Sequence, residues 1–268
     1  MPQSDLELAL RDVSESVGSA HDLPSELPLA HLTSAKWLAS ILSVGGLRPR
    51  TCKVFHQDLL YFSYGGVFYR TSKLQTEDAS ALPVAMVFRP QVLDTCAQLF
   101  PFDSGAMANR LFGDIWHDSM NPFEKRFVVN TNLSEAARLL VHCCYEENRR
   151  YINGEPKAKL AFPSPALIAL HDFLCKDLSK LKTVPNGIDH RQRSIELICS
   201  TAVELADNLL WIGFPNLQVD DTMAHIRRLT RTVPQYWTYD FRRNFSPDEY
   251  AALLENQAKS QVIERYIK

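Results

Sequence analysis

The feature that most constrains the fold is a short apolar stretch that ends in His31-Leu32-Thr33-Ser34 and runs directly into an amphipathic segment. In that segment the apolar side chains recur at the three- and four-residue spacing of a helix, and Gly45-Gly46 supplies the stop that commonly ends one. The order predicts a strand at about 28–33 followed by a helix over 35–44. We expect the main domain to begin at this strand.

The rest of the chain alternates between strand and helix patterns, which predicts an α+β fold. An aromatic-rich stretch over 58–69, broken by Gly65-Gly66, is typical of a strand that bulges into a loop. Ser246-Pro247-Asp248-Glu249 suits a helix N-terminus and predicts a closing helix over 246–266. Further strands are expected over 83–88, 193–201 and 209–213, and further helices over 5–13, 105–113, 133–148 and 164–181.

Bulk composition excludes few functions. The formal net charge of the 268 residues is -2, so a nucleic-acid partner must be held by a local basic patch. The six cysteines lack the paired spacing of a zinc ribbon or of a disulfide framework, and we interpret them as buried thiols in a reducing compartment. The sequence has neither a signal-peptide pattern nor a run of about 18 apolar residues. We therefore expect a soluble cytoplasmic protein with no membrane partner.

His31 and Thr33 are the first candidate site residues. Two residues apart on a strand, they face the same side and can present one imidazole and one hydroxyl to a single ligand. A lone histidine in an apolar strand also has a structural use, as a buried side chain satisfied by the backbone. The sequence leaves both interpretations open.

Two further segments carry candidate site residues. On a strand Tyr61 and Phe62 lie on opposite faces, so one can line a cleft while the other fills the core. Tyr64 and Tyr69, on either side of the glycine pair, are alternative aromatic surfaces for stacking. Glu196 interrupts an apolar strand pattern, so it is either an exposed alternation position or a functional carboxylate.

Three motifs then occur in a fixed order: His31-Leu32-Thr33 before a helix that ends in Gly-Gly-Leu, Tyr61-Phe62 with Tyr69-Arg70, and Arg193-Ser194-Ile195-Glu196-Leu197-Ile198. In this order they resemble DarT-type and tRNA 2'-phosphotransferase-related members of the ADP-ribosyltransferase superfamily. The spacer from Arg70 to Arg193 is unmatched, and Pro101-Phe102-Asp103-Ser104-Gly105-Ala106 has no counterpart in the family pattern. The resemblance implies residues 1–27 as an N-terminal helix and linker, and 28–268 as a domain with a split mixed β-sheet, flanking helices and a helical insertion at about 105–185.

The resemblance also implies that NAD is consumed as a substrate. His31 and Thr33 would hydrogen-bond ribose or nicotinamide groups, and Tyr61 would stack on the nicotinamide ring. Glu196 would bind a ribose hydroxyl, stabilise the positive charge that builds as the glycosidic bond breaks, and help deprotonate the acceptor. The full set expected to bind NAD is His31, Thr33, Tyr61, Tyr64, Tyr69, Arg70 and Arg193.

Arginines and aromatic residues alternate near the C-terminus. No acidic residue occurs from Thr222 to Tyr239. Because arginine binds phosphates and aromatic rings stack on bases, the stretch is interpretable as a nucleic-acid surface; the alternative is a solvated helix face followed by core aromatics. Its candidate residues are Arg227, Arg228, Arg231 and Trp237. A second basic group after the first expected helix, Arg48, Arg50 and Lys53, is expected near the NAD pyrophosphate.

Other chemistry has weaker support. His171 and Cys175 form a helical pair without recognisable further ligands, so we expect no metal site, and neither a P-loop nor a dinucleotide fingerprint occurs. We therefore predict an NAD-dependent mono-ADP-ribosyltransferase that modifies a macromolecule, nucleic acid in preference to protein, of the kind used as a toxin or anti-phage effector together with an antitoxin. The alternative is a non-catalytic module of the same fold that binds nucleic acid or a protein partner through its Arg-rich C-terminal third.

Overall fold

The computed structural model describes residues 3–17, 23–68, 78–112, 123–177, 190–217, 219–242 and 245–267. The chain divides into two compact units. Unit 1 comprises 1–26, 96–198 and 267–268, and unit 2 comprises 27–95 and 199–266. Each unit is therefore assembled from segments that are far apart in sequence.

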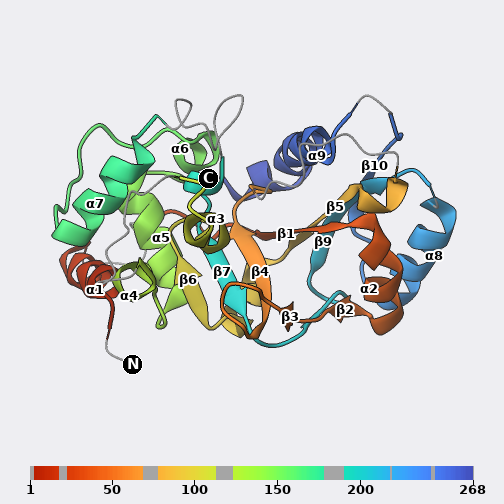
Figure 1. Cartoon of the computed structure of the whole chain (residues 1–268), viewed down its shortest axis with the longest axis horizontal. Coiled ribbons are helices and arrows are strands. Elements are labelled where there is room, and N and C mark those ends of the chain that lie inside the picture. Colours follow the sequence, from red (N-terminus) through yellow and green to blue (C-terminus); the bar gives the residue numbers. More distant parts are fainter. Residues whose placement is uncertain are drawn as a thin grey trace. The chain divides into compact units, whose positions relative to one another are not determined.

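Unit 2 is built on a mixed sheet in the order β10-β9-β5-β1-β4, with β3 (Arg50–Thr51) paired to β4 (Figure 1). Strands β9 and β10 run parallel, and the other pairs are antiparallel. Every residue of β5 is buried, as expected for an apolar strand covered on both faces. The main strands are β1 (Leu29–Ser34), β4 (Asp58–Tyr64), β5 (Pro83–Phe88), β9 (Leu209–Pro215) and β10 (Gln235–Tyr239).

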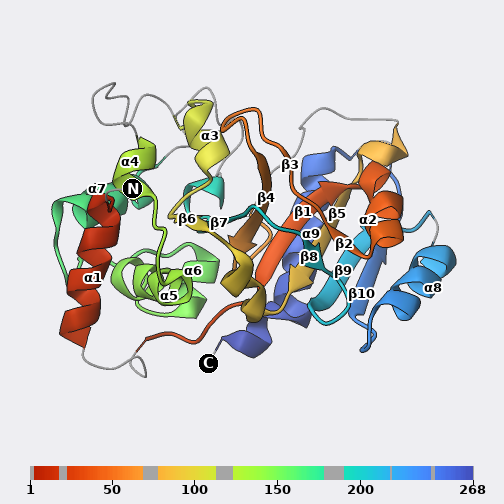
Figure 2. The same ribbon diagram turned by 90° about the horizontal axis from the view of Figure 1, so that it is seen from below.

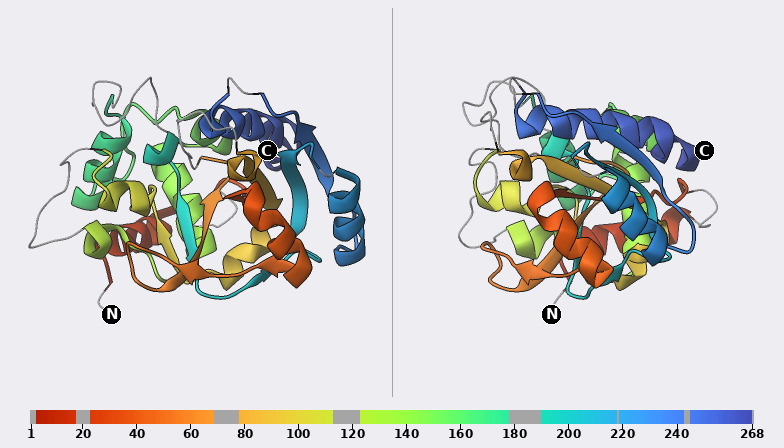
Figure 3. Two further views of the ribbon diagram at one scale, coloured as in Figure 1. Left: turned by 45° about the vertical axis from the view of Figure 1, so that its right-hand side comes forward. Right: turned by 90° about the vertical axis from the view of Figure 1, so that its right-hand side faces the viewer.

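Helix α9 (Pro247–Gln261) packs on β5 and β9 (Figure 3). It begins with a complete capping box, in which the Ser246 hydroxyl accepts from the backbone N–H of Glu249 and the Glu249 carboxylate accepts from the N–H of Ser246. The helix approaches the sheet closely at Gly213, where a Cβ atom would lie 2.3 Å from Leu254 Cδ2 and 2.4 Å from the Trp211 ring. A glycine at this position is what lets the helix sit on the strand.

The strand-to-helix order predicted at the start of the domain is confirmed. A short 3₁₀ turn, η2 (Ala35–Trp37), follows β1 and leads into α2 (Leu38–Val44), which ends at Gly45 in the left-handed conformation, with φ 69°. Helix α2 packs against α8 (Val219–Leu229). The unit is completed by β2 (Gly46–Leu47) paired with β8 (Val203–Glu204) and by the 3₁₀ turns η3 (Ala79–Ala81), η4 (Pro90–Thr95) and η7 (Ile263–Tyr266).

Unit 1 is mainly helical. Helix α1 packs against α4, α5 and α7 (Figure 2). Its strands β6 (Gln98–Phe100) and β7 (Glu196–Cys199) pair antiparallel, with Phe100 opposite Glu196. The helices are α1 (Asp5–Val17), α3 (Ser104–Ala108), α4 (Phe123–Phe127), α5 (Leu133–Cys144), α6 (Asn148–Asn153) and α7 (Pro165–Leu174), with the 3₁₀ turn η6 (His190–Gln192) before β7.

The predicted α+β class, with a mixed sheet and flanking helices, is confirmed. Two predictions need correction. The helix expected over 133–148 ends at Cys144, and a new helix begins at Asn148 after Glu146 adopts a left-handed φ of 81°. The expectation of six buried thiols is also wrong, because Cys96 and Cys199 are disulfide-bonded and Cys175 is an exposed thiol.

Candidate functional site

Glu196 is a buried carboxylate at the start of an apolar strand. Its side chain is only 8% exposed, while Ile195, Leu197 and Ile198 are at most 2% exposed. The alternative of an exposed alternation position is therefore wrong. A charged group in such surroundings requires hydrogen-bond partners, and Ser104 supplies two.

Ser104 donates two hydrogen bonds to one oxygen of Glu196, one from its backbone N–H and one from its side-chain hydroxyl. The backbone nitrogen lies 3.1 Å from Glu196 Oε2, and the Ser104 hydroxyl donates to the same atom. Ser104 is the first residue of α3, and the preceding Asp103 caps that helix by accepting from Ala106 N–H at 2.6 Å. The Pro101–Ala106 segment, unassigned from sequence, thus contacts the proposed catalytic carboxylate.

Arg193 is held against α6. Gly154 ends that helix with a left-handed φ of 72°, and a Cβ atom there would lie 1.6 Å from a guanidinium nitrogen of Arg193. Burial raises the pKa of the nearby Tyr145 phenol well above its usual value, and the positive charge of Arg193 opposes that shift only in part. The structure therefore places Arg193 over Gly154 in unit 1.

His31 presents a single tautomer on β1. Its Nδ1 lies 2.8 Å from the Tyr61 carbonyl oxygen, which can only accept, so Nδ1 carries the proton and donates. Burial lowers the pKa of His31; the Tyr61 carbonyl opposes this and the positive charge of Arg50 adds to it. The imidazole is therefore neutral at pH 7, with Nε2 as a hydrogen-bond acceptor.

The sheet register decides which side chains share the face of His31. His31 pairs with Met86 and Thr33 with Val84, so both predicted residues lie on one face, as expected. Ala30 pairs with Ser63, which places Ser63, and Tyr61 two residues away, on the opposite face. Phe62 is instead the aromatic beside His31, with ring centroids 5.8 Å apart.

Tyr64 and Tyr69 are the other two aromatic candidates for contact with NAD. Tyr64 is 0% exposed, and its hydroxyl accepts from Leu27 N–H at 3.0 Å. It is a core residue with no surface for a ligand, which corrects the prediction that it contacts NAD. Tyr69 and Arg70 lie outside the described residues.

Arg50 forms a cationic surface with a tryptophan that the sequence did not single out. The Arg50 guanidinium carbon lies 3.5 Å from the centroid of the Trp37 ring, and Lys36 Nζ lies 5.2 Å from the same centroid. Arg48, by contrast, pairs with Glu204 at 2.7 Å. Of the three basic residues expected near a pyrophosphate, Arg50 is the one whose positive charge lowers the pKa of His31. Helical spacing counts Trp37 among the apolar positions of the predicted helix, but it gives no sign of the contact with Arg50, which lies on β3.

The Arg-rich segment divides into a surface part and a core part. Arg227 and Arg228, in the last turn of α8, are exposed, whereas Arg231 pairs with Asp207 at 3.3 Å. On β10, Trp237 is half-buried and Tyr236 is 46% exposed. Tyr239 stacks on Tyr250 with centroids 4.5 Å apart and belongs to the core. The exposed arginines of α8 therefore fit the interpretation as a nucleic-acid surface, whereas Tyr239 fits the interpretation as a core aromatic residue.

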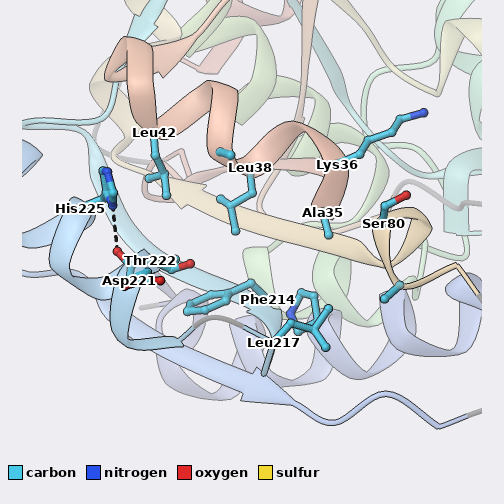
Figure 4. A pocket seen from close by; sticks show the side chains of 13 residues that line it. Ala35, Lys36, Leu38, Leu42, Ser80, Phe214, Leu217, Asp221, Thr222 and His225 are labelled. Atoms are coloured by element: carbon cyan, nitrogen blue, oxygen red, sulfur yellow. Dashed lines mark hydrogen bonds between the residues drawn. The ribbon is translucent and has the colours of Figure 1, made fainter.

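A cavity of about 430 Å³ opens in unit 2 between α2, η3, the end of β9 and α8 (Figure 4). Leu38, Leu42 and Phe214 point into it, and at its rim His225 Nδ1 donates to the Asp221 carbonyl at 2.9 Å. The volume suits a small molecule. Among the predicted NAD-binding residues that the structure describes, none lines this cavity.

The predicted NAD-binding residues are distributed over both units. Glu196 and Arg193 belong to unit 1, whereas His31, Thr33 and Tyr61 belong to unit 2. The convergence of His31 and Glu196 on one ligand stays a prediction. Within the described ranges, no group of three or more His, Cys, Asp and Glu side chains is arranged to hold a metal ion, and no helix there combines the length and apolar character needed to cross a bilayer.

Neither a protein-family model nor a curated protein matches the chain. Among solved structures, it is similar to DarT of Thermus sp. 2.9 in complex with NAD+, at 12% identity and a TM-score of 0.42, over 81% of this chain and 97% of that one. The same DarT in complex with ADP-ribosylated ssDNA matches at 13% identity and a TM-score of 0.41, over 81% and 96% of the two chains. Its complex with carba-NAD+ matches at 14% identity and a TM-score of 0.40, over 81% and 97%. These three matches are complexes of one protein, the DarT of Thermus sp. 2.9, with different ligands.

Proposed function

We propose that this chain is an NAD-consuming mono-ADP-ribosyltransferase with Glu196 as its catalytic carboxylate. The observation that carries the proposal is the burial of Glu196 in an apolar strand with one oxygen held by two donors of Ser104. Burying a carboxylate is costly, and an apolar residue would serve the core better. Such a group is a candidate for function rather than packing.

A fixed carboxylate fits the chemistry of glycosidic cleavage. As nicotinamide leaves NAD, positive charge develops on the ribose carbon and its ring oxygen. A preorganised anion beside that charge lowers the barrier, as carboxylates do in glycosidases. In the proposed reaction, Glu196 stabilises this charge and helps deprotonate the acceptor.

Strand β1 and its surroundings in unit 2 carry groups that could bind NAD. Neutral His31, with Nε2 as an acceptor, suits a ribose hydroxyl donor, and Thr33 adds a hydroxyl on the same face. Phe62, whose ring lies beside His31, is only 1% exposed and supports the imidazole from the core rather than offering a surface to NAD. Arg50, whose guanidinium carbon lies 3.5 Å from the centroid of the Trp37 ring, suits a phosphate of NAD.

We propose nucleic acid rather than protein as the acceptor. Arg227 and Arg228 are exposed in the last turn of α8, and Tyr236 offers an exposed ring on β10. Exposed guanidinium groups together with an exposed aromatic ring in one unit suit a single strand, which presents both phosphates and unstacked bases. A role as a toxin or anti-phage effector, restrained by an antitoxin, is the biological setting that the sequence resemblance implies.

The test is incubation of the protein with labelled NAD and single-stranded DNA, RNA or protein. We expect Glu196→Gln to lower label transfer about 100-fold or more. Glu7→Gln is the matched control, because Glu7 is also buried in unit 1, at 5% exposure, and accepts from Thr131 Oγ1 and Asn130 N–H. Equal transfer by Glu196→Gln and the wild type would remove Glu196 from the mechanism.

The rival function is a non-catalytic module that binds nucleic acid through the same exposed arginines. It predicts binding of single-stranded DNA without any consumption of NAD. Failure of the wild type to bind NAD at millimolar concentration, while DNA binding persists, would favour the module and reject the transferase.

A further inference from the structure

We infer that Ser104 is a positioning residue for Glu196, and that the Pro101–Ala106 segment exists in this chain to orient that carboxylate. The inference rests on the proposed function and deepens it. Its basis is that both donors of Ser104 converge on Glu196 Oε2, the backbone nitrogen at 3.1 Å and the hydroxyl beside it. Ser104 itself is 0% exposed, so these contacts are shielded from bulk solvent.

Strand pairing brings the two residues together although they are 92 positions apart in sequence. Phe100, the last residue of β6, is the register partner of Glu196 on β7. The chain then turns over three residues and begins α3 at Ser104. Within the turn, Asp103 N–H donates to the Arg191 carbonyl at 3.0 Å, which ties the segment to the residues leading into β7.

The turn is anchored from behind by aromatic packing. Phe102 is 0% exposed and lies with its ring centroid 5.9, 5.6 and 5.7 Å from those of Phe123, Phe127 and Phe173. These rings come from α4 and α7, so the turn is fixed by two separate helices. A turn held in this way keeps the Ser104 hydroxyl at a defined place, which is what preorganisation of a catalytic carboxylate requires.

A purely structural interpretation makes a different prediction. If Glu196 served only to satisfy the first turn of α3, removal of the Ser104 hydroxyl would change stability and leave the properties of Glu196 toward NAD unaltered. If Ser104 positions Glu196, the loss of a donor to the ionised form raises the pKa of Glu196 and slows the chemical step. Asp103, Arg191 and Arg193 are the charged neighbours along the same segments, and the substitution leaves all three in place.

The experiment compares Ser104→Ala with Thr131→Ala. The control is matched because the Thr131 hydroxyl donates to a buried carboxylate of the same unit, Glu7 Oε1, at 2.6 Å. The first measurement needs no activity: a ¹³C NMR titration of the Glu196 carboxyl, assigned with Glu196→Gln. The second is kcat and KM for NAD consumption as a function of pH.

For Ser104→Ala we expect a higher pKa of Glu196, an acidic limb of the rate profile displaced to higher pH, and kcat reduced about 10- to 100-fold with little change in KM. Thr131→Ala should show none of these changes. Ser104→Thr, which keeps the hydroxyl, should restore most of kcat. If Ser104→Ala does not fold, Ser104→Cys, of similar shape and with a weaker donor, takes its place.

An unchanged Glu196 titration in the Ser104 variant overturns the inference, whatever the activity. A shifted titration with unchanged kcat also overturns it, because Glu196 would then be oriented without consequence for the reaction. A shifted titration in a protein whose wild type does not consume NAD rejects the proposed function instead, and leaves the coupling of Ser104 to Glu196 as a structural contact.

Discussion

Gly213 tests the packing that holds α9 on the sheet. In Gly213→Ala the new Cβ would lie 2.3 Å from Leu254 Cδ2 and 2.4 Å from the Trp211 ring. Both neighbours are 0% exposed and cannot move into solvent. The Trp211 indole is further fixed by its N–H, which donates to Gln261 Oε1 at 2.8 Å.

The magnitude follows from three contributions. Overpacking a core costs about 1–3 kcal/mol, and displacing the indole would lose a hydrogen bond of about 1 kcal/mol. Replacing glycine by alanine within a strand returns roughly 0.5–1 kcal/mol of backbone entropy. We therefore expect Gly213→Ala to lower the free energy of unfolding by about 2 kcal/mol.

A double-mutant cycle with Leu254→Ala isolates the cause. The single Leu254→Ala change should cost about 2–5 kcal/mol, because it removes buried methyl groups. In that background the Gly213→Ala cost should fall by about 1 kcal/mol, since one of the two obstructing side chains is gone. Urea denaturation of the four proteins measures the cycle. Additivity of the two single changes within about 0.5 kcal/mol would refute the steric reasoning.

Three further predictions concern ionisation, capping and nucleic acid. Folding lowers the pKa of His31, so as the pH falls the unfolded chain binds the proton before the folded chain does. His31 therefore contributes stability above about pH 6.5, and this contribution is lost as the pH falls. In His31→Gln the decline in the free energy of unfolding between pH 8 and pH 5 should be smaller than in the wild type. Ser246→Ala removes the capping box of α9 and should cost about 1 kcal/mol in guanidinium denaturation; an unchanged midpoint would contradict this role. Replacing Arg227 and Arg228 by serine should weaken binding of single-stranded DNA at low salt and reduce the slope of log K against log salt by about 1.4; an unaltered slope would show that α8 does not contact phosphates.

Local signals predicted the elements best. The helical spacing before Gly45 and the capping sequence at Ser246 each specify a boundary within a few residues, and the structure has a left-handed C-cap and a complete capping box at these places. The predicted helix over 133–148 is too long because no glycine or proline interrupts the sequence directly after Cys144, whereas the left-handed backbone at Glu146 ends the helix.

Which side chains lie beside the candidate site residues depends on strand pairing between segments that are distant in sequence. Whether Tyr61 or Phe62 faces His31 depends on the register between β1 and β4, which no spacing within the aromatic segment reveals. Ser104 carried no signal for the same reason, since its partner Glu196 is reached only through the pairing of β6 with β7. The sequence marked His31 and Glu196 as candidates, but it did not reveal that Phe62 and Ser104 lie beside them.

The contact of Arg193 with Gly154 has a consequence for recognising distant relatives. A side chain at position 154 would meet the Arg193 guanidinium and would have to adopt a left-handed φ of 72°, so a substitution there displaces the arginine. A smaller residue at position 193 would meet no such obstacle, so the dependence runs in one direction. Relatives that keep the arginine before the glutamate strand should therefore also keep a glycine at the end of α6, and a larger residue at the glycine position should occur only where the arginine is lost.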